Sequence, residues 1–191
     1  MTIIIHKKFE DYAYVLDYLS QGRINENRQS FKTEALVQLI GTNYFTLLEA
    51  TPRTDIKIAQ LEKVYIGKEL PRRKISHIAG RINYRQLTST AKSELPGIIE
   101  KIIVENPPQF IAFFNTTQAV TPRMHSLELV PGIGKKYMWA ILQARERKPF
   151  DSFQEIQERT GIPDPVKLVS KRILEELHVP EPKYRLFTRS S

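Results

Sequence analysis

The first part of the chain alternates apolar and polar positions with the two-residue period of β-strands. In the run YAYVLDYL (12–19) the tyrosines Tyr12, Tyr14 and Tyr18 fall on one parity, and smaller apolar residues fall on the other. Two further apolar runs within 34–52 are separated by GTN, a sequence typical of a tight turn between antiparallel strands. This pattern predicts a β-rich N-terminal region.

More β-rich runs follow at 57–67 and 75–87, again without a long amphipathic helix between them. Four or five short strands at this spacing are typical of small closed barrels. We therefore expect residues 1–88 to form a β-barrel domain of the OB-like kind.

The period changes to that of a helix in the segment 89–118, where four isoleucines share one face. NPP ends this helix, and the aromatic and aliphatic run FIAFF follows it. A segment so apolar has to be buried, which is not the behaviour of a free linker. Residues 89–120 are therefore predicted to be a helical connector docked between two domains.

Residues 121–191 carry the signals of several short helices. Thr121 as N-cap with Pro122 at the first helical position predicts one start. Ser152 with Glu155 forms a capping-box pattern for another helix, and Gly161 is a natural stop. A last helix opens after Asp164-Pro165, with one apolar face made of Val166, Val169, Ile173 and Leu177. The expected fold class is α+β, a barrel followed by an all-α domain.

The stretch LVPGIGKK (129–136) interrupts this helical region. Pro131 forbids a helix from continuing, and Gly132 and Gly134 permit turns and a close approach to bare backbone N–H groups. A new helix beginning at Lys135 presents unpaired N–H groups at its positive dipole end. Lys135 and Lys136 add charge where cations disfavour the helix itself, which indicates an anion such as phosphate as the partner.

This hairpin resembles the signature of the helix-hairpin-helix family, and LVPGIG followed by KKYMWAILQAR matches it closely. The resemblance implies a backbone-phosphate site without base specificity at Gly132, Gly134, Lys135 and Lys136, with Ile133 plugging the core. The alternative is a plain tight turn between helices with solvated lysines. Gly-Ile recurs 29 positions later, so the domain resembles the paired (helix-hairpin-helix)2 type.

The second copy of the hairpin reads TGIPDP. Its proline removes one N–H group, and the carboxylate of Asp164 is placed to occupy the helix end that would otherwise bind phosphate. We therefore expect the first hairpin to be functional and the second to be structural.

Composition fits a polyanionic partner. The 29 basic against 21 acidic residues give a net charge of +8, which favours nucleic acid without requiring it. The chain has no cysteine, so disulfides and thiolate sites are excluded, and this suits the cytoplasm. No apolar run approaches the roughly 20 residues of a membrane span, so no membrane partner is expected.

Two candidate contacts fall in the predicted barrel. Tyr14 and Tyr18, with Tyr12, provide a possible platform for stacking unpaired bases, the alternative being that they pack under the connector. Arg72, Arg73 and Lys74 lie in GKELPRRK, predicted as a loop, where they either follow a nucleic-acid backbone or are simply solvated. The histidines His6, His77, His125 and His178 have no metal-site spacing. No catalytic residue, metal site or cofactor is predicted.

The whole-chain pattern is similar to the archaeal DUF655 family, whose members are described as nucleotide- or nucleic-acid-binding proteins. The resemblance rests on the β-rich first half, EKVYIGK near residue 65, the apolar connector and the C-terminal PGIG. It implies a fold and a general function, with no catalytic residues.

The predicted function is therefore non-catalytic, sequence-nonspecific nucleic-acid binding, with the hairpin on the phosphate backbone and the barrel adding strand contacts. The alternative is a nucleic-acid-processing enzyme or a protein-binding adaptor built on the same folds. Phosphate contacts are common to DNA and RNA, so the sequence does not choose between them. It also does not fix the oligomeric state.

Overall fold

The computed structural model describes residues 9–22 and 34–189. Its internal contacts divide the chain into two compact units. The first comprises Met1–Leu95 with Thr188–Ser191, and the second comprises Pro96–Phe187. The division falls inside one helix, so most of the segment predicted as a connector belongs to the second unit. His6, one of the four histidines of the chain, lies outside the described residues.

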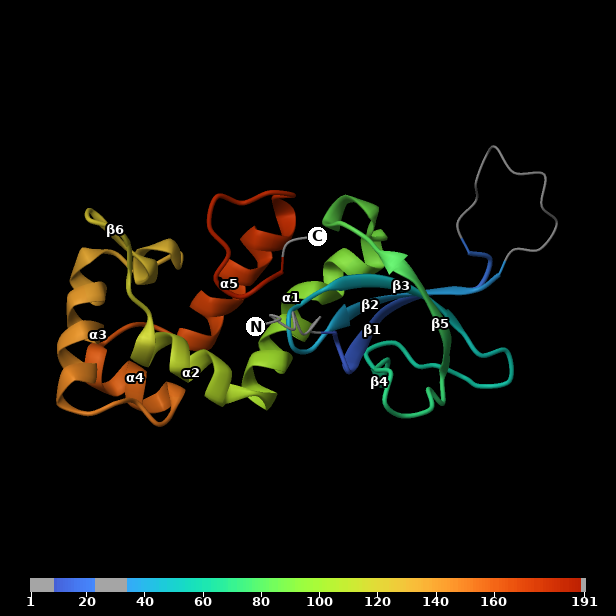
Figure 1. Cartoon of the computed structure of the whole chain (residues 1–191), viewed down its shortest axis with the longest axis horizontal. Coiled ribbons are helices and arrows are strands. Elements are labelled where there is room, and N and C mark those ends of the chain that lie inside the picture. The colour runs from blue at the N-terminus through green and yellow to red at the C-terminus, as the bar shows by residue number, and fades with distance from the viewer. Residues whose placement is uncertain (1–8, 23–33, 190–191) are drawn as a thin grey trace, which may run out of the picture. The chain divides into compact units, whose positions relative to one another are not determined.

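The first unit is built on one five-stranded antiparallel sheet (Figure 1) with the strand order β4-β1-β2-β3-β5. The strands are β1 Tyr12–Leu19, β2 Leu36–Gly41, β3 Leu47–Pro52, β4 Lys63–Tyr65 and β5 Ile75–Arg81. The predicted strands at 12–19 and within 34–52 are confirmed. The run at 57–67 contributes only three strand residues, and the run at 75–87 ends in a short 3-10 helix, η1 Tyr84–Gln86.

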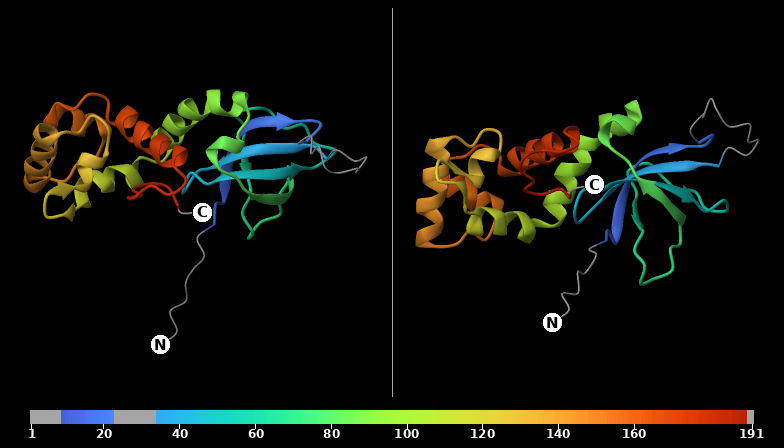
Figure 2. Two further views of the ribbon diagram at one scale, coloured as in Figure 1. Left: turned by 90° about the horizontal axis from the view of Figure 1, so that it is seen from above. Right: turned by 45° about the horizontal axis from the view of Figure 1, so that its top comes forward.

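The sheet is a curled half-barrel (Figure 2) and not the closed barrel predicted. Among the described residues β4 and β5 are its two edges and do not pair with each other. Both strands run antiparallel to their single neighbours, β1 and β3, and therefore in the same direction as each other. A tight hairpin cannot connect such strands. The long connection 66–74 instead carries the chain from one edge to the other, and one side stays open.

The concave face of the sheet carries the apolar core of this unit. Its buried members come from every strand and from Ile66 just after β4; they are Ala13, Val15, Val37, Leu39, Leu48, Ala50, Val64, Ile66 and Ile75. On β1 a bulge between Val15 and Asp17 shifts the alternation of faces. The single parity predicted for the three tyrosines is therefore interrupted within the strand.

Polar groups on the other face tie the sheet to the start of helix α1 Ser89–Glu105. Gln38 donates from Nε2 to Glu49 Oε1 at 3.0 Å, and its Oε1 accepts the Thr88 N–H at 2.9 Å. The Thr88 hydroxyl in turn donates to Asp17 Oδ2 at 2.6 Å. These hydrogen bonds satisfy polar groups that burial would otherwise leave without partners.

The second unit is helical apart from one two-stranded hairpin. It contains the end of α1, then α2 Pro107–Thr116, η2 Ser126–Leu129, α3 Lys135–Arg147, α4 Phe153–Thr160 and α5 Pro165–His178. The predicted isoleucine face of α1 is confirmed, since Ile98, Ile99, Ile102 and Ile103 are buried. FIAFF is itself helical, in α2, and buries Phe110, Ile111 and Phe114.

The prediction that a helix starts at Thr121 is wrong. Strands β6 Ala119–Thr121 and β7 Met124–His125 pair there as a small antiparallel hairpin. Pro122 lies in the turn between them, where its fixed φ is as favourable as at a helix start. The same proline signal is compatible with both structures, and strand pairing decided between them.

The later helix boundaries follow the predicted caps. Ser152 Oγ accepts the Glu155 N–H at 3.1 Å, and Gly161 ends α4 with a φ of 72°. Val169 and Ile173 are fully buried on the inner face of α5. None of the helices in the ranges 9–22 and 34–189 has the length and apolar character needed to cross a membrane.

Candidate functional site

The candidate site is the hairpin that joins η2 to α3. Its entrance is fixed by His125, whose Nδ1 accepts the Leu127 N–H at 3.1 Å. Glu128 completes the cap, because its Oε2 accepts the His125 N–H at 2.9 Å. These reciprocal bonds hold the short 3-10 helix η2 directly before the PGIG turn.

The turn itself is closed by backbone hydrogen bonds. The Ile133 N–H donates to the Val130 carbonyl at 3.0 Å, and Gly132 has a φ of 93°, a region that favours glycine. A Cβ on Gly132 would lie 2.9 Å from Leu168 Cδ2, so the Leu168 side chain would have to shift to admit it. Ile133 is only 3% exposed, which confirms its predicted role as a plug in the core.

Gly134 is the N-cap of α3, and no side chain caps this helix end. Its φ of −89° and ψ of −175° are extended backbone that any residue can adopt, and a Cβ there would meet nothing within 4 Å. A side chain at Gly134 would therefore not strain the turn. The space beside Gly134 is open, and the first N–H groups of α3, at the positive end of its dipole, have no intrahelical acceptor.

Lys135 and Lys136 begin this helix, and the backbone of Arg123 lies close to Lys135. Lys136 is exposed, with its Nζ 5.9 Å from the centroid of the Tyr137 ring. Lys135 forms an ion pair with Glu128, with Nζ 2.8 Å from Oε1, and its Nζ also donates to the Arg123 carbonyl at 3.4 Å. The exposed Arg123 pairs with no carboxylate among the described residues. The hydrogen bond from Lys135 holds the pKa of Glu128 below its ordinary value of 4.5.

Sequence reasoning missed two residues of this site. Arg123 lies close to Lys135 because β6 and β7 fold back, which no sequence period reveals. Trp139 is 57% exposed on α3, three positions after Lys136 and four after Lys135, so it shares their side of the helix. It is the chain's one tryptophan, and its spacing from the lysines was a usable signal.

The second hairpin has the expected blocked helix end. Ile162 is fully buried, like Ile133 in the first hairpin. Asp164 Oδ1 accepts the Lys167 N–H at 3.1 Å, so its carboxylate occupies the position that is open at Gly134. The two copies therefore share packing and differ in access to the helix end.

The candidate residues of the half-barrel have different environments. Tyr14 is 2% exposed, so the prediction that its ring is a stacking surface is wrong; the bulge after Val15 separates its environment from that of Tyr18. Tyr18 is 44% exposed and lines a groove together with Arg72 and Arg73. The groove also includes Arg53 and His77, which the sequence did not single out as contacts. Lys74 instead forms an ion pair with Glu62.

The chain is similar to known proteins over nearly its whole length. A family model described as a protein of unknown function, DUF655, matches residues 9–189. The chain belongs to the DUF655 family. An uncharacterized protein of Methanocaldococcus jannaschii is 43% identical to this DUF655 protein over 184 residues, covering 96% of this chain and 82% of that protein.

A solved structure supports the same assignment. The crystal structure of a DUF655-model protein from Archaeoglobus fulgidus is 44% identical to this DUF655 protein, with a TM-score of 0.85. The match covers 94% of this chain and 100% of the other. The family predicted from the whole-chain pattern is confirmed, and so is the mixed α+β architecture.

The entrance to the hairpin is expected to be sensitive to acid. Burial, and then the nearby charge of Arg145, lowers the pKa of His125 from its ordinary value of 6.5. A lowered folded pKa means that the stabilisation is complete above pH 6.5 and is lost as pH falls through the folded pKa. Protonation at Nδ1 would remove the acceptor for Leu127. His125→Asn keeps a capping acceptor without the titration.

We expect thermal unfolding of the second unit, followed by circular dichroism from pH 7.5 to 4.5, to shift less with pH in His125→Asn than in the parent. Superimposable pH profiles would show that the pKa of His125 is the same in the folded and unfolded protein.

Proposed function

We propose that this DUF655 protein binds nucleic acid non-catalytically, by gripping the phosphate backbone at the hairpin that precedes α3. The observation that carries the proposal is the N-terminus of α3, which is uncapped by any side chain and opens onto free space at Gly134. Unpaired N–H groups, a helix dipole and neighbouring cations together favour a phosphate oxygen.

The position of the lysines supports this assignment. Cations at a helix N-terminus oppose the dipole, so Lys135 and Lys136 gain nothing there from the helix itself. A phosphate bound between the amides and the ammonium groups would reverse that balance through charge-assisted hydrogen bonds. Backbone amides and phosphates carry no base identity, so binding would be independent of sequence and common to DNA and RNA.

We further propose that the second unit is of the (helix-hairpin-helix)2 type. The shared Gly-Ile turns, with both isoleucines buried, support this description. The half-barrel is proposed to be OB-like only in the sense of a five-stranded, partly open sheet that binds along its surface. The groove beside Tyr18, with Arg53, Arg72 and Arg73, is its candidate strand contact.

The basic test is fluorescence anisotropy with labelled duplex DNA, single-stranded DNA and a structured RNA, each at several salt concentrations. We expect binding to all three, with log K falling linearly with log salt, because binding releases counterions from neutralised phosphates. Binding to none of the three at low salt would refute the proposed function.

The lysines are expected to differ in the same assay. Lys136→Ala should flatten the salt slope on B-form DNA by roughly 0.9, the value of one phosphate contact. Lys135→Ala should flatten it less, because Glu128 already neutralises part of that charge. Glu128→Gln should strengthen binding, since it releases Lys135 and removes a carboxylate near the phosphate. Lys171→Ala, on α5 outside the hairpin, is the control. Equal slopes for all variants would contradict the site.

The half-barrel contact is tested by Tyr18→Ala. Loss of one aromatic stack should weaken single-strand binding by roughly 1–3 kcal/mol and leave duplex binding nearly unchanged. Tyr14→Ala is the matched variant, and we expect it to lower the free energy of unfolding because it truncates a buried ring. Equal losses on single and double strands for folded Tyr18→Ala would argue against stacking.

A further inference from the structure

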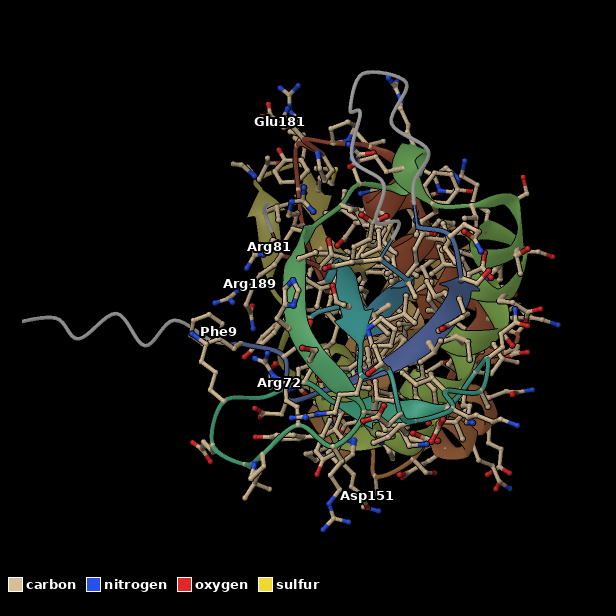
Figure 3. All side chains as sticks on the ribbon, turned by 90° about the vertical axis from the view of Figure 1, so that its right-hand side faces the viewer. Phe9, Arg72, Arg81, Asp151, Glu181 and Arg189 are labelled. Carbon is tan, nitrogen blue, oxygen red and sulfur yellow. The ribbon has the colours of Figure 1, made fainter. Side chains whose placement is uncertain are left out.

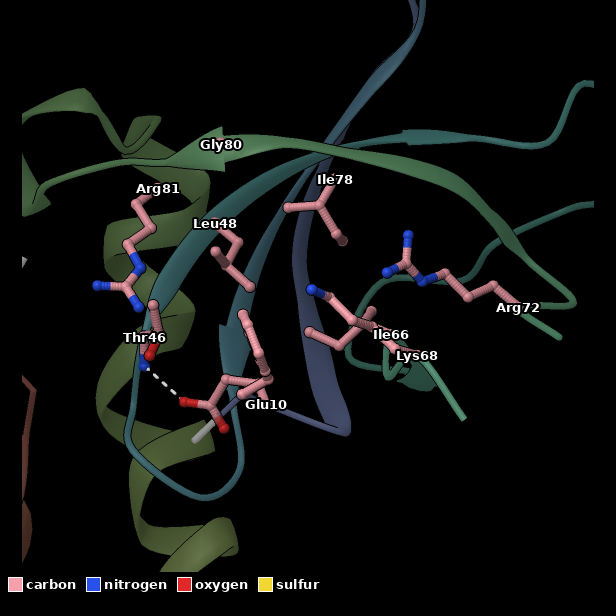
Figure 4. Close-up of a pocket in the computed structure, with 10 residues that line it drawn as sticks. Glu10, Thr46, Leu48, Ile66, Lys68, Arg72, Ile78, Gly80 and Arg81 are labelled. Carbon is pink, nitrogen blue, oxygen red and sulfur yellow. Dashed lines mark hydrogen bonds between the residues drawn. The ribbon is translucent and has the colours of Figure 1, made fainter. Parts of the chain in front are cut away.

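A second candidate site lies in the first unit, at the open side of the half-barrel. It is a pocket of about 230 Å³ between the end of β4 and strands β3 and β5. Ile66, Leu48 and Ile78 form its floor (Figure 4), and all three belong to or pack against the apolar core. Closure of the barrel would have covered this part of the core, whereas the half-barrel leaves it accessible.

Cations surround the apolar floor. Lys68, Arg72 and Arg81 all line the pocket, with Arg81 at one end and Arg72 at the other (Figure 4). Figure 3 shows Arg72 near the start of β5 and Arg81 at its end. Among the described residues no carboxylate pairs with Lys68 or Arg72. Arg72 donates from Nε to the Gly67 carbonyl at 3.0 Å.

The one acid in the lining, Glu10, is occupied by backbone groups. Its Oε2 accepts the Asn43 N–H at 2.8 Å, and its Oε1 accepts the N–H groups of Tyr44 at 3.0 Å and Thr46 at 3.1 Å. Three backbone donors stabilise this carboxylate, which holds the turn between β2 and β3. The lining therefore combines three cations with one acid whose oxygens already accept hydrogen bonds, so an anionic ligand is favoured.

An aromatic ring stands beside the pocket. Phe9 is 46% exposed, and Lys68 Nζ lies 3.9 Å from its ring centroid. Exposed phenylalanine rings and arginine guanidinium planes both stack on flat π systems. The volume also limits the ligand, because an apolar cavity of about 150 Å³ holds one benzene ring and drug-sized ligands need about 300 Å³ or more. One ring system fits here.

We propose that this pocket binds a nucleoside monophosphate unit, with the planar base over the apolar floor and the phosphate among Lys68, Arg72 and Arg81. The unit is either a free mononucleotide or the 5′-terminal nucleotide of a strand, which present the same chemistry. This proposal does not depend on the hairpin, because every lining residue belongs to the first unit.

Isothermal titration calorimetry with the full chain tests the ligand. The probes are adenosine 5′-monophosphate, adenosine, inorganic phosphate, and a 5′-phosphorylated tetranucleotide with its unphosphorylated counterpart. We expect the phosphorylated probe to bind at least tenfold more tightly than adenosine or inorganic phosphate alone. Binding of the mononucleotide indicates a free ligand, and binding of only the phosphorylated tetranucleotide indicates a strand end. Binding of neither overturns the proposal.

Rim variants locate the site. Lys68→Ala and Arg81→Ala should each lower the affinity for the nucleotide at least fivefold, and Phe9→Ala should lower it by a similar factor. Arg85→Ala on η1 is the matched control, because Arg85 is exposed and does not line the pocket. Ile78→Phe should fill the space above the apolar floor and abolish nucleotide binding. If Ile78→Phe fails to fold, the variants of the exposed rim residues still test the site. Unchanged nucleotide affinity in folded Lys68→Ala and Arg81→Ala overturns the assignment.

A failure of the pocket and a failure of the hairpin would differ. Gly134→Val should leave mononucleotide affinity unchanged, because Gly134 lies in the other unit. Lys68→Ala should leave the salt slope for duplex DNA unchanged. Loss of mononucleotide binding in Gly134→Val would place the nucleotide at the hairpin and overturn the pocket.

Discussion

Replacing Gly134 by valine is expected to weaken binding to duplex DNA by about 10- to 100-fold in a protein that stays folded. Gly134 has an extended backbone, and a Cβ there meets nothing within 4 Å, so the native turn accommodates the side chain. The branched side chain instead fills the space through which a phosphate would reach the N–H groups of α3. Each charge-assisted hydrogen bond lost contributes about 1.5–3 kcal/mol, and about 1.4 kcal/mol is a tenfold change.

The measurement is anisotropy with labelled duplex DNA for the parent, Gly134→Ala and Gly134→Val, after thermal unfolding has established stability. The alanine variant should bind with intermediate affinity because its side chain is smaller. The N-cap change itself should cost about 1 kcal/mol of stability or less. Asp164→Asn at the second hairpin is the control, and its affinity should stay the same or rise. Parental affinity in folded Gly134→Val would show that the hairpin is only a turn.

Replacing Gly132 by valine should act on stability, with an expected loss of about 2–5 kcal/mol in the free energy of unfolding of the second unit. The φ of 93° is costly for any residue with a Cβ, and that Cβ would lie 2.9 Å from Leu168. Backbone strain and overpacking each contribute a part of the loss. Since such a unit is stable by only about 5–15 kcal/mol, the loss is readily measured by urea denaturation.

Gly161→Ala separates the two contributions. Gly161 has a similar φ of 72°, but a Cβ there would meet nothing within 4 Å. Gly161→Ala should therefore lower the free energy of unfolding through backbone strain alone, by about 1–2 kcal/mol. Leu168→Ala combined with Gly132→Ala should recover part of the loss beyond additivity, because it removes the clash. If Gly132→Ala loses no more stability than Gly161→Ala, the Leu168 side chain moves aside without cost.

The two glycines of PGIG thus have different roles, although the sequence pattern predicts the same role for both. Gly132 is needed by the fold, since its φ of 93° is strained for any residue with a Cβ and that Cβ would also displace the Leu168 side chain. Gly134 is not needed by the fold, and its open surroundings leave ligand access as the reason for a missing side chain. Substitution at the first should change stability, and substitution at the second should change affinity.

Local signals determined much of this protein from the sequence. The two-residue period set the strands β1, β2 and β3, and the isoleucine face set α1, because these patterns record which side of an element is buried. The caps at Ser152 and Asp164 and the stop at Gly161 were also predictable, since each depends on atoms within a few residues. The PGIG hairpin, with Ile133 as its buried plug, follows from the same local rules.

Only the tertiary structure decided which distant segments meet. Strand pairing placed β4 and β5 on opposite edges, which left the half-barrel open and created the pocket at Ile66. Pairing of β6 with β7 made Thr121 a strand residue. The fold also brought the Arg123 carbonyl and the Glu128 carboxylate to Lys135. Tyr14 is buried although Tyr12, two positions earlier on the same strand, is exposed. The edge positions of β4 and β5 depend on contacts between residues far apart in the chain, and the contacts of Thr121 and Lys135 depend on how nearby segments fold back. No local period encodes the free energies of either kind of contact.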